Sequence, residues 1–221
     1  MPADRALILD FGGVITRTLF ETHDMTERAL GLPPGTLTWA GPFHPETDGL
    51  WQAMQAGQIT ERDYWLERTR EVGALIGEHW TEMSQFVRAA RGAEPAAIIR
   101  PEFHACLDEA KAHGIKLAIL SNELDLFYGA DFREKLAFLK DFHTIIDATH
   151  TGILKPDPRA YQATLDALNL PPENTVFVDD QPKNIAGAQA LGLQTIHFDV
   201  ARPHASYHKA LDLLIPERTT P

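Results

Sequence analysis

Short apolar runs alternate with helix-like segments along most of the chain, and this alternation constrains the fold more than any other feature. Five runs read as buried strands, at residues 6–9, 116–120, 144–146, 175–178 and 195–198. Helix-like segments lie between several of them, at residues 101–114, 158–169 and 184–191. Strands that alternate with helices predict an α/β fold with a doubly wound parallel sheet, in which ligands bind beyond the carboxyl ends of the strands.

The stretch from residue 17 to residue 98 breaks this alternation. It contains no strand-like run, and breaks rich in Gly and Pro separate its first helical segments. The helical segments are residues 20–30, 48–56, 61–76 and 78–90. We expect a Rossmann-like core domain of residues 1–16 and 99–215, a helical cap domain of residues 17–98 inserted into it, and a disordered tail at residues 216–221.

The composition argues against several classes of partner. The 221 residues carry a net charge of -11, and an acidic chain without a basic block is a poor ligand for nucleic acid or anionic membranes. Cys106 is the only cysteine, so no disulfide can form within the chain. The apolar run before Asp10 is too short for a signal peptide, and no segment approaches the ~18 apolar residues of a membrane span. We therefore expect a soluble, cytoplasmic protein.

Asp10 directly follows the first apolar run and precedes Gly12 and Gly13. A carboxylate can attack phosphorus to form an aspartyl-phosphate, which water then hydrolyses. The two glycines allow the backbone to turn sharply and to approach a phosphate closely. This segment predicts a catalytic carboxylate at Asp10 and a phosphate-binding turn at Gly12 and Gly13.

An acidic pair follows another apolar run. Asp179 and Asp180 would lie beside Asp10 at one edge of a parallel sheet, and such a group of carboxylates is costly unless a cation neutralises it. Hard oxygen ligands of this kind suit Mg2+. The alternative is that Asp179 caps the next helix, which has Pro182 in its first turn.

A lysine and a hydroxyl complete the group of polar residues at strand ends. Lys155 lies in a Pro-flanked segment just before a helix, where its ammonium group can bind a phosphoryl oxygen and stabilise an ionised Asp10. Ser121 and Asn122 follow the run at 116–120, where the hydroxyl and neighbouring amides can donate to the same phosphate. The alternative role of Ser121 is that of a cap.

These four segments resemble, in order and spacing, the motifs of the haloacid dehalogenase (HAD) superfamily of hydrolases. The resemblance covers the whole chain, because that family also inserts a helical cap after its first motif. It implies that Asp10 is the nucleophile, Ser121 the phosphate-binding hydroxyl and Lys155 the charge-stabilising cation. It also implies a Mg2+ site, whose ligands are Asp10, the carbonyl oxygen of Gly12, and Asp180 with Asp179 beside it. Asn184 falls where many members carry a further acid of the metal site.

One position departs from the family pattern. Family phosphatases usually carry a general acid two residues after the nucleophile, and here that position is Gly12. The pattern Asp-Phe-Gly-Gly-Val and the cap segment at residues 57–65 resemble a branch that includes alpha-D-glucose-1-phosphate phosphatases. A sugar 1-phosphate has a better leaving group than an alkyl phosphate, so loss of an acid typically worth about 10²–10⁴-fold matters less there. Candidate substitutes for the acid are Glu21, His23, His44 and Glu123.

The leading interpretation is a Mg2+-dependent phosphomonoesterase of a small phosphorylated metabolite, with a sugar phosphate as one candidate. A metal-free 2-haloacid dehalogenase, a phosphomutase and a non-catalytic binding module are the alternatives. The dehalogenase interpretation leaves Asp179 and Asp180 without a purpose.

Within the cap, we expect Trp51 and Trp65 to be core residues and Trp39 and Phe43 to be available to a substrate.

Overall fold

A computed structural model describes residues 4–91, 95–122, 124–128 and 132–215. The chain divides into two compact units. The first contains Met1–Arg17, Ile99–Asp125 and Arg133–Pro221, and the second contains Thr18–Ile98 and Leu126–Phe132. In this division Leu126–Phe132 groups with the helical unit. The predicted tail at 216–221 lies outside the described residues.

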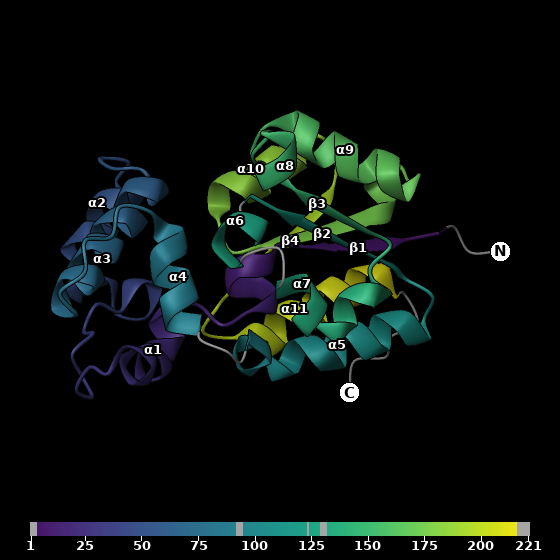
Figure 1. Cartoon of the computed structure of the whole chain (residues 1–221). Helices are drawn as coiled ribbons and strands as arrows, with labels where there is room; N and C mark the ends of the chain where they lie inside the picture. Colours follow the sequence, from purple (N-terminus) through teal and green to yellow (C-terminus); the bar gives the residue numbers. More distant parts are fainter. Residues whose placement is uncertain (1–3, 92–94, 123, 129–131, 216–221) are drawn as a thin grey trace. The chain divides into compact units, whose positions relative to one another are not determined.

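The first unit is built on a five-stranded parallel sheet (Figure 1). Its strands are β1 (Ala6–Leu9), β2 (Lys116–Ser121), β3 (Thr144–Asp147), β4 (Thr175–Asp179) and β5 (Gln194–His197). Their order in the sheet is β3-β2-β1-β4-β5, so the direction of winding reverses between β1 and β4. The predicted parallel, doubly wound sheet is confirmed, and its ligand-binding crevice is expected at that reversal.

Helices cover both faces of this sheet (Figure 1). On one face, α9 (Pro158–Leu168) and α10 (Pro182–Ala190) bury Tyr161 and Ile185 against Ile8 and Phe177 of the strands. On the other face lie α5 (Pro101–Ala112) and α11 (Pro203–Leu214). The side chains of the central strands β1, β2 and β4 are almost all buried on both faces, as their continuous apolar runs require, whereas those of the edge strand β5 are half-buried or exposed. Helix α11 was not predicted from the sequence.

Short helices complete this part of the chain. They are α6 (Leu124–Tyr128), α7 (Phe132–Lys135) and α8 (Ala148–Thr151). The carboxylate of Asp147, at the end of β3, accepts hydrogen bonds from the backbone N–H groups of Leu124 and Thr149, at 3.2 and 2.9 Å. One buried side chain therefore caps both α6 and α8.

The second unit is helical. Its main helices are α1 (His23–Leu30), α2 (Gly49–Gln55), α3 (Glu61–Leu75) and α4 (Met83–Arg91). Thr60 and Asp63 form a capping box that begins α3. Helix α4 begins five residues later than predicted, because the side chain of Gln85 accepts hydrogen bonds from the backbone N–H groups of Thr81 and Glu82 and so caps the turn before it.

An aromatic core holds the second unit together. Trp39 is only 8% exposed and packs edge-on against Phe20 and Trp65. The expectation that Trp39 is available to a substrate is therefore wrong, whereas Trp65 is a core residue as predicted. The Gly- and Pro-rich sequence around Trp39 suggests an exposed loop, but it does not reveal the tertiary contact between Trp39 and Phe20.

Among the described residues, no helix is long and apolar enough to cross a membrane.

Candidate active site

Residues from separate segments meet at the carboxyl ends of the central strands. Leu9 of β1 pairs with Val178 of β4 in the parallel register, and the backbone N–H of Asp10 donates to the carbonyl oxygen of Val178 over 2.9 Å. Asp10 and Asp179 therefore follow aligned strand ends. Ser121 ends β2 on the other side of β1, where it is buried. The strand register itself thus brings these predicted residues to one edge of the sheet.

Lys155 connects the two aspartates. Its Nζ lies 2.7 Å from Oδ1 of Asp10 and 2.7 Å from Oδ2 of Asp179. The side chains of Lys155 and Asp179 are 1% and 0% exposed, whereas that of Asp10 is 13% exposed. Of these three charged groups, Asp10 is thus the one that a ligand in solvent can reach.

Burial and charge perturb the ionisation of this group. Burial acts against a charged lysine, but the two carboxylates outweigh it and raise the pKa of Lys155 above its ordinary value. Burial raises the pKa of Asp10 to about 7; the charge of Asp179 acts in the same direction, and Lys155 opposes them. One cation shared by two buried carboxylates does not fully stabilise both charges. A second cation at this site would favour ionised Asp10.

The carboxylate of Asp179 is fully engaged by protein donors. Besides Lys155, it accepts a hydrogen bond from the backbone N–H of Gln181 at 2.8 Å. The side-chain amide of Asn184 donates to both of its oxygens at 3.1 Å. Asp179 thus accepts a hydrogen bond at the entry to α10, as the capping alternative predicts, and it also binds Lys155.

The donor set fits a divalent cation. Carboxylate oxygens of Asp10, Asp179 and Asp180 lie within 4.8 Å of one another. The Oδ1 of Asn184 is buried and has no hydrogen-bond partner among the described residues. Because Mg2+ prefers hard oxygen ligands, these residues can hold it, and Asp10 and Asp180 are better placed to do so than the saturated Asp179. Imidazole Nε2 of His197 lies 3.1 Å from the backbone oxygen of Asp180.

The turn after Asp10 contains one glycine that needs to be glycine and one that does not. Gly13 has a φ of 77°, in the left-handed region, and its N–H points to the Oγ1 of Thr16 at 3.4 Å. Gly12 has a φ of -70°, and a Cβ added there would meet nothing within 4 Å. The site therefore has room for the missing acid at Gly12, and the backbone does not exclude it.

Two buried side chains, neither of which belongs to a sequence motif, stabilise this turn by hydrogen bonds. Arg100, which is 2% exposed, donates through Nε and Nη2 to the carbonyl oxygen of Gly13, at 3.1 and 3.0 Å. The hydroxyl of Tyr207 donates to the carbonyl oxygen of Val14 at 2.7 Å. Neither residue was predicted from the sequence to belong to the site. A charged residue at the end of an apolar stretch was the only signal for Arg100.

Asn122 is bound to the backbone of the lysine. Its Oδ1 accepts a hydrogen bond from the N–H of Lys155 at 2.7 Å, and its Nδ2 donates to the carbonyl oxygen of Lys155 at 3.2 Å. By contrast, the hydroxyl of Ser121 makes no hydrogen bond with the described residues. Of these two predicted phosphate ligands, Ser121 keeps its polar group available.

The candidate substitutes for the acid have local roles. Glu21 accepts hydrogen bonds from the backbone N–H and the hydroxyl of Thr18. His23 packs edge-on against Trp39, and burial lowers its pKa. His44 is exposed, and its Nδ1 lies 3.6 Å from Oε1 of Glu46. All three belong to the second unit. Glu123 lies outside the described residues.

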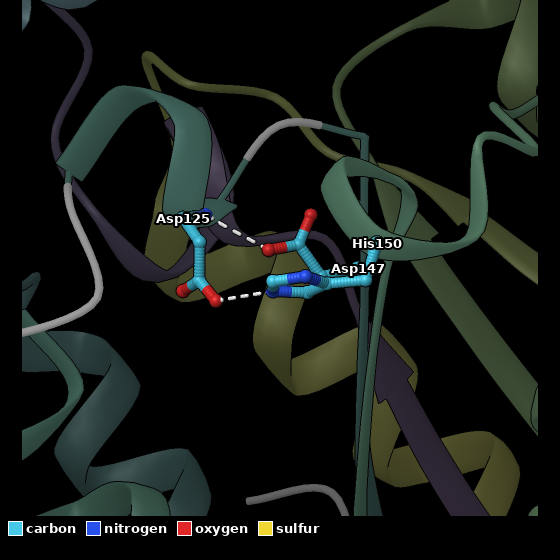
Figure 2. A group of neighbouring side chains, drawn as sticks. All are labelled: Asp125, Asp147 and His150. Atoms are coloured by element: carbon cyan, nitrogen blue, oxygen red, sulfur yellow. Dashed lines mark hydrogen bonds and ion pairs between the residues drawn. The ribbon is translucent and has the colours of Figure 1, made fainter.

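A second group of titratable side chains, Asp125, Asp147 and His150, lies elsewhere in the first unit (Figure 2). The Nε2 of His150 is 2.6 Å from Oδ2 of Asp125, and Asp147 accepts a hydrogen bond from the N–H of Asp125. Arg133 already supplies a cation here, because its Nε donates to Oδ1 of Asp125 over 2.7 Å. We interpret this group as a structural network of hydrogen bonds and ion pairs.

Comparison with protein families gives a consistent result. A model of haloacid dehalogenase-like hydrolases matches residues 5–192. A fold with the same architecture occurs in the HAD-hydrolase YfnB from Bacillus subtilis, which was crystallised with magnesium. That structure aligns with a TM-score of 0.66 at 18% identity, over 96% of this chain and 99% of the other. At this identity the likeness shows the fold alone.

Several curated proteins are similar to the chain. Acyl-CoA dehydrogenase family member 10 from Mus musculus is 28% identical over 96% of this chain, and the chain spans only 19% of that protein. Phosphoserine phosphatase from Thermus thermophilus is 28% identical, over 90% of this chain and 83% of its own length. Phosphatase MT3486 from Mycobacterium tuberculosis is 32% identical, over 88% of this chain and 87% of its own length.

Proposed function

The chain belongs to the haloacid dehalogenase-like hydrolase family, and from this premise we propose that it is a Mg2+-dependent phosphomonoesterase of small phosphorylated metabolites. The observation that carries the proposal is the position of Lys155, whose ammonium group lies 2.7 Å from both Asp10 and Asp179. This arrangement keeps a partly exposed carboxylate next to a fixed positive charge. Two relatives named as phosphatases, which the chain matches over 83% and 87% of their length, support the same activity.

In this mechanism Asp10 is the nucleophile. An oxygen of its carboxylate forms a bond to phosphorus while the ester P–O bond breaks, and the alcohol or sugar oxygen leaves with the electron pair. Water then attacks the aspartyl-phosphate, which releases inorganic phosphate and regenerates the carboxylate. Lys155 offsets the negative charge that the phosphoryl group brings to Asp10, and the Ser121 hydroxyl donates to a phosphoryl oxygen.

The metal site comprises Asp10, Asp180 and the Gly12 carbonyl, with Asp179 beside them. When bound there, Mg2+ would supply positive charge for the phosphoryl oxygens and for ionised Asp10. The three carboxylates within 4.8 Å of one another support this assignment. Asp179 contributes mainly by holding Lys155, since its oxygens are already engaged by three other groups.

The leaving group defines the substrate class. Gly12 has no side chain to protonate a departing oxygen, so the enzyme should favour esters whose leaving group is stable as an anion. Sugar 1-phosphates and aryl phosphates meet this condition, whereas alkyl phosphates such as glycerol phosphate do not. We assign the second unit, with residues 18–98, to the cap that selects among such substrates.

The test is hydrolysis of a panel of phosphate monoesters with and without Mg2+. We expect release of inorganic phosphate that stops in EDTA and returns when Mg2+ is added. Asp10→Asn should abolish turnover, and beryllium fluoride, which mimics an aspartyl-phosphate, should bind the wild type only. Full phosphatase activity of the wild type in EDTA would refute the Mg2+ dependence, and release of halide from a 2-haloacid without phosphatase activity would replace the proposal with the dehalogenase.

A further inference from the structure

We infer that Asn122 is a positioning residue that fixes the backbone of Lys155, and that substrate binding is not its main role. The inference rests on the proposed function, because it concerns the cation of the same site. Asn122 follows the end of β2, and Lys155 lies 33 residues further along the chain. The two are joined by a pair of hydrogen bonds between one side chain and one backbone.

These two hydrogen bonds form a clamp that fixes the orientation of the Asn122 side-chain amide. Oδ1 must face the N–H of Lys155, at 2.7 Å, and Nδ2 must face its carbonyl oxygen, at 3.2 Å. The reverse orientation would place donor against donor and acceptor against acceptor. An ionised Asp at position 122 would offer only acceptors and Leu would offer neither group, so neither residue can replace both bonds.

The clamped residue carries the ammonium group that binds both aspartates. Beyond the clamped peptide, the Lys155 side chain ends on Asp10 and Asp179, each 2.7 Å from Nζ. A long lysine side chain loses much rotamer freedom when it is held in one place, and a fixed backbone reduces the number of conformers that compete with that placement. Loss of the clamp should therefore make the position of the Lys155 Nζ less well defined.

A substrate could still compete for the side chain of Asn122, since one of its amide hydrogens is not used by the clamp. The two roles give different results in combination with Lys155. A residue that acts through Lys155 has no further effect once the ammonium group is gone, because residues acting as a unit are not additive. A residue that binds substrate directly keeps its effect.

The experiment is a double-mutant cycle of Asn122→Ala and Lys155→Met, read as turnover of an aryl phosphate and as binding of inorganic phosphate in the presence of Mg2+. Binding is needed because Lys155→Met should have little turnover. The control is Thr175→Val, which removes a hydrogen bond of 2.8 Å between a side chain and the backbone at the start of β4. Thr175 lies at the other end of the strand from the site.

Asn122→Ala should lower kcat by about 10- to 100-fold, the range typical for loss of a residue that orients a metal ligand. It should weaken phosphate binding in the wild type and change it less than about twofold in Lys155→Met, as expected for residues that act as a unit. Its effect on the melting temperature should be the same in both backgrounds, because the clamp bonds the backbone. Thr175→Val should keep the wild-type kcat.

Equal losses of phosphate binding in both backgrounds would overturn the inference and make Asn122 a substrate ligand. A wild-type kcat in Asn122→Ala would overturn it as well. If Lys155→Met fails to fold, Lys155→Gln, which keeps a polar side chain beside the carboxylates, replaces it in the cycle. A wild type that neither hydrolyses phosphate esters nor binds phosphate would refute the proposed function itself, which is a different result from an active wild type and an unaffected variant.

Discussion

The Nζ of Lys155 lies 2.7 Å from Oδ2 of Asp179, and both side chains are buried almost completely. Each group compensates the cost of removing the other from water, so neither can be changed alone without leaving a buried charge. Asp10 shares the same ammonium group but retains contact with solvent. Lys155 thus neutralises a buried carboxylate and, in the proposed mechanism, also supplies positive charge beside the nucleophile.

Asp179→Asn should destabilise the protein. The amide keeps the shape of the side chain but removes a charge that a buried Lys155 needs, and breaking such a pair typically costs about 3–5 kcal/mol in the free energy of unfolding. Chemical denaturation of the two proteins would measure it. A stability equal to that of the wild type would show that Asp10 alone suffices to hold Lys155.

Asp180→Asn should act on the metal instead. We expect the Mg2+ concentration for half-maximal activity to rise on the order of tenfold or more, because Mg2+ is commonly held through only one or two carboxylates. The free energy of unfolding without metal should change little or should increase, since a carboxylate is removed from a crowded acidic group. The measurement is activity and unfolding as a function of Mg2+. An unchanged Mg2+ requirement would remove Asp180 from the ligand set.

Gly12→Asp should broaden the substrate range. The wild type should hydrolyse aryl phosphates and sugar 1-phosphates better than glycerol phosphate. A carboxyl group at position 12 can protonate a poor leaving group, so the difference should shrink by part of the ~10²–10⁴-fold that a general acid provides. The variant should fold normally, because Gly12 has a φ of -70° and open space at its Cβ. Circular dichroism is the folding control.

A wild type that hydrolyses alkyl and aryl phosphates at equal rates would contradict this prediction. It would show that another residue already acts as the acid. The pH-rate profiles of variants at Glu21, His23, His44 and Glu123 would then identify it.

Much of the sheet and its polar edge could be predicted from the sequence, because strand ends carry a local signal. Asp10, Ser121 and Asp179 each follow or close an apolar run, and the parallel register places those ends side by side. Helix α11 had a signal too, since Tyr207 and Leu211 recur at helical spacing, and it was overlooked. These features depend on residues that are close in sequence.

The supports of the site could not be predicted in the same way. Arg100 holds the carbonyl oxygen of Gly13 across 87 residues of sequence, and Tyr207 holds that of Val14 across 193. Neither contact leaves a periodic pattern or a motif. The burial of Trp39 is similar, because its Gly- and Pro-rich surroundings are typical of an exposed loop. Such contacts follow from the packing of distant elements and require the tertiary structure.

Asp48 and Arg68 form a buried ion pair in the second unit. Asp48 accepts hydrogen bonds from the backbone N–H of Trp51, the hydroxyl of Tyr64 and Nη2 of Arg68, at 2.9, 2.8 and 2.6 Å. Burial alone would raise the pKa of Asp48, but these hydrogen bonds and the charge of Arg68 outweigh it and lower the pKa below 3.8. The unfolded chain therefore binds more protons than the folded one at acidic pH.

It follows that Asp48 stabilises the fold fully above a pH of about 4, and that this contribution is lost as the pH falls through the folded pKa. Asp48→Asn should lower the free energy of unfolding at neutral pH by about 3–5 kcal/mol, since Arg68 loses its buried partner. It should also flatten the fall in melting temperature between pH 4 and more acidic conditions. Asp24→Asn is the matched control, because it removes an ion pair with Arg28 in which both side chains are exposed. If the melting temperature of Asp48→Asn falls with decreasing pH as steeply as that of Asp24→Asn, other carboxylates set the acid stability of this unit.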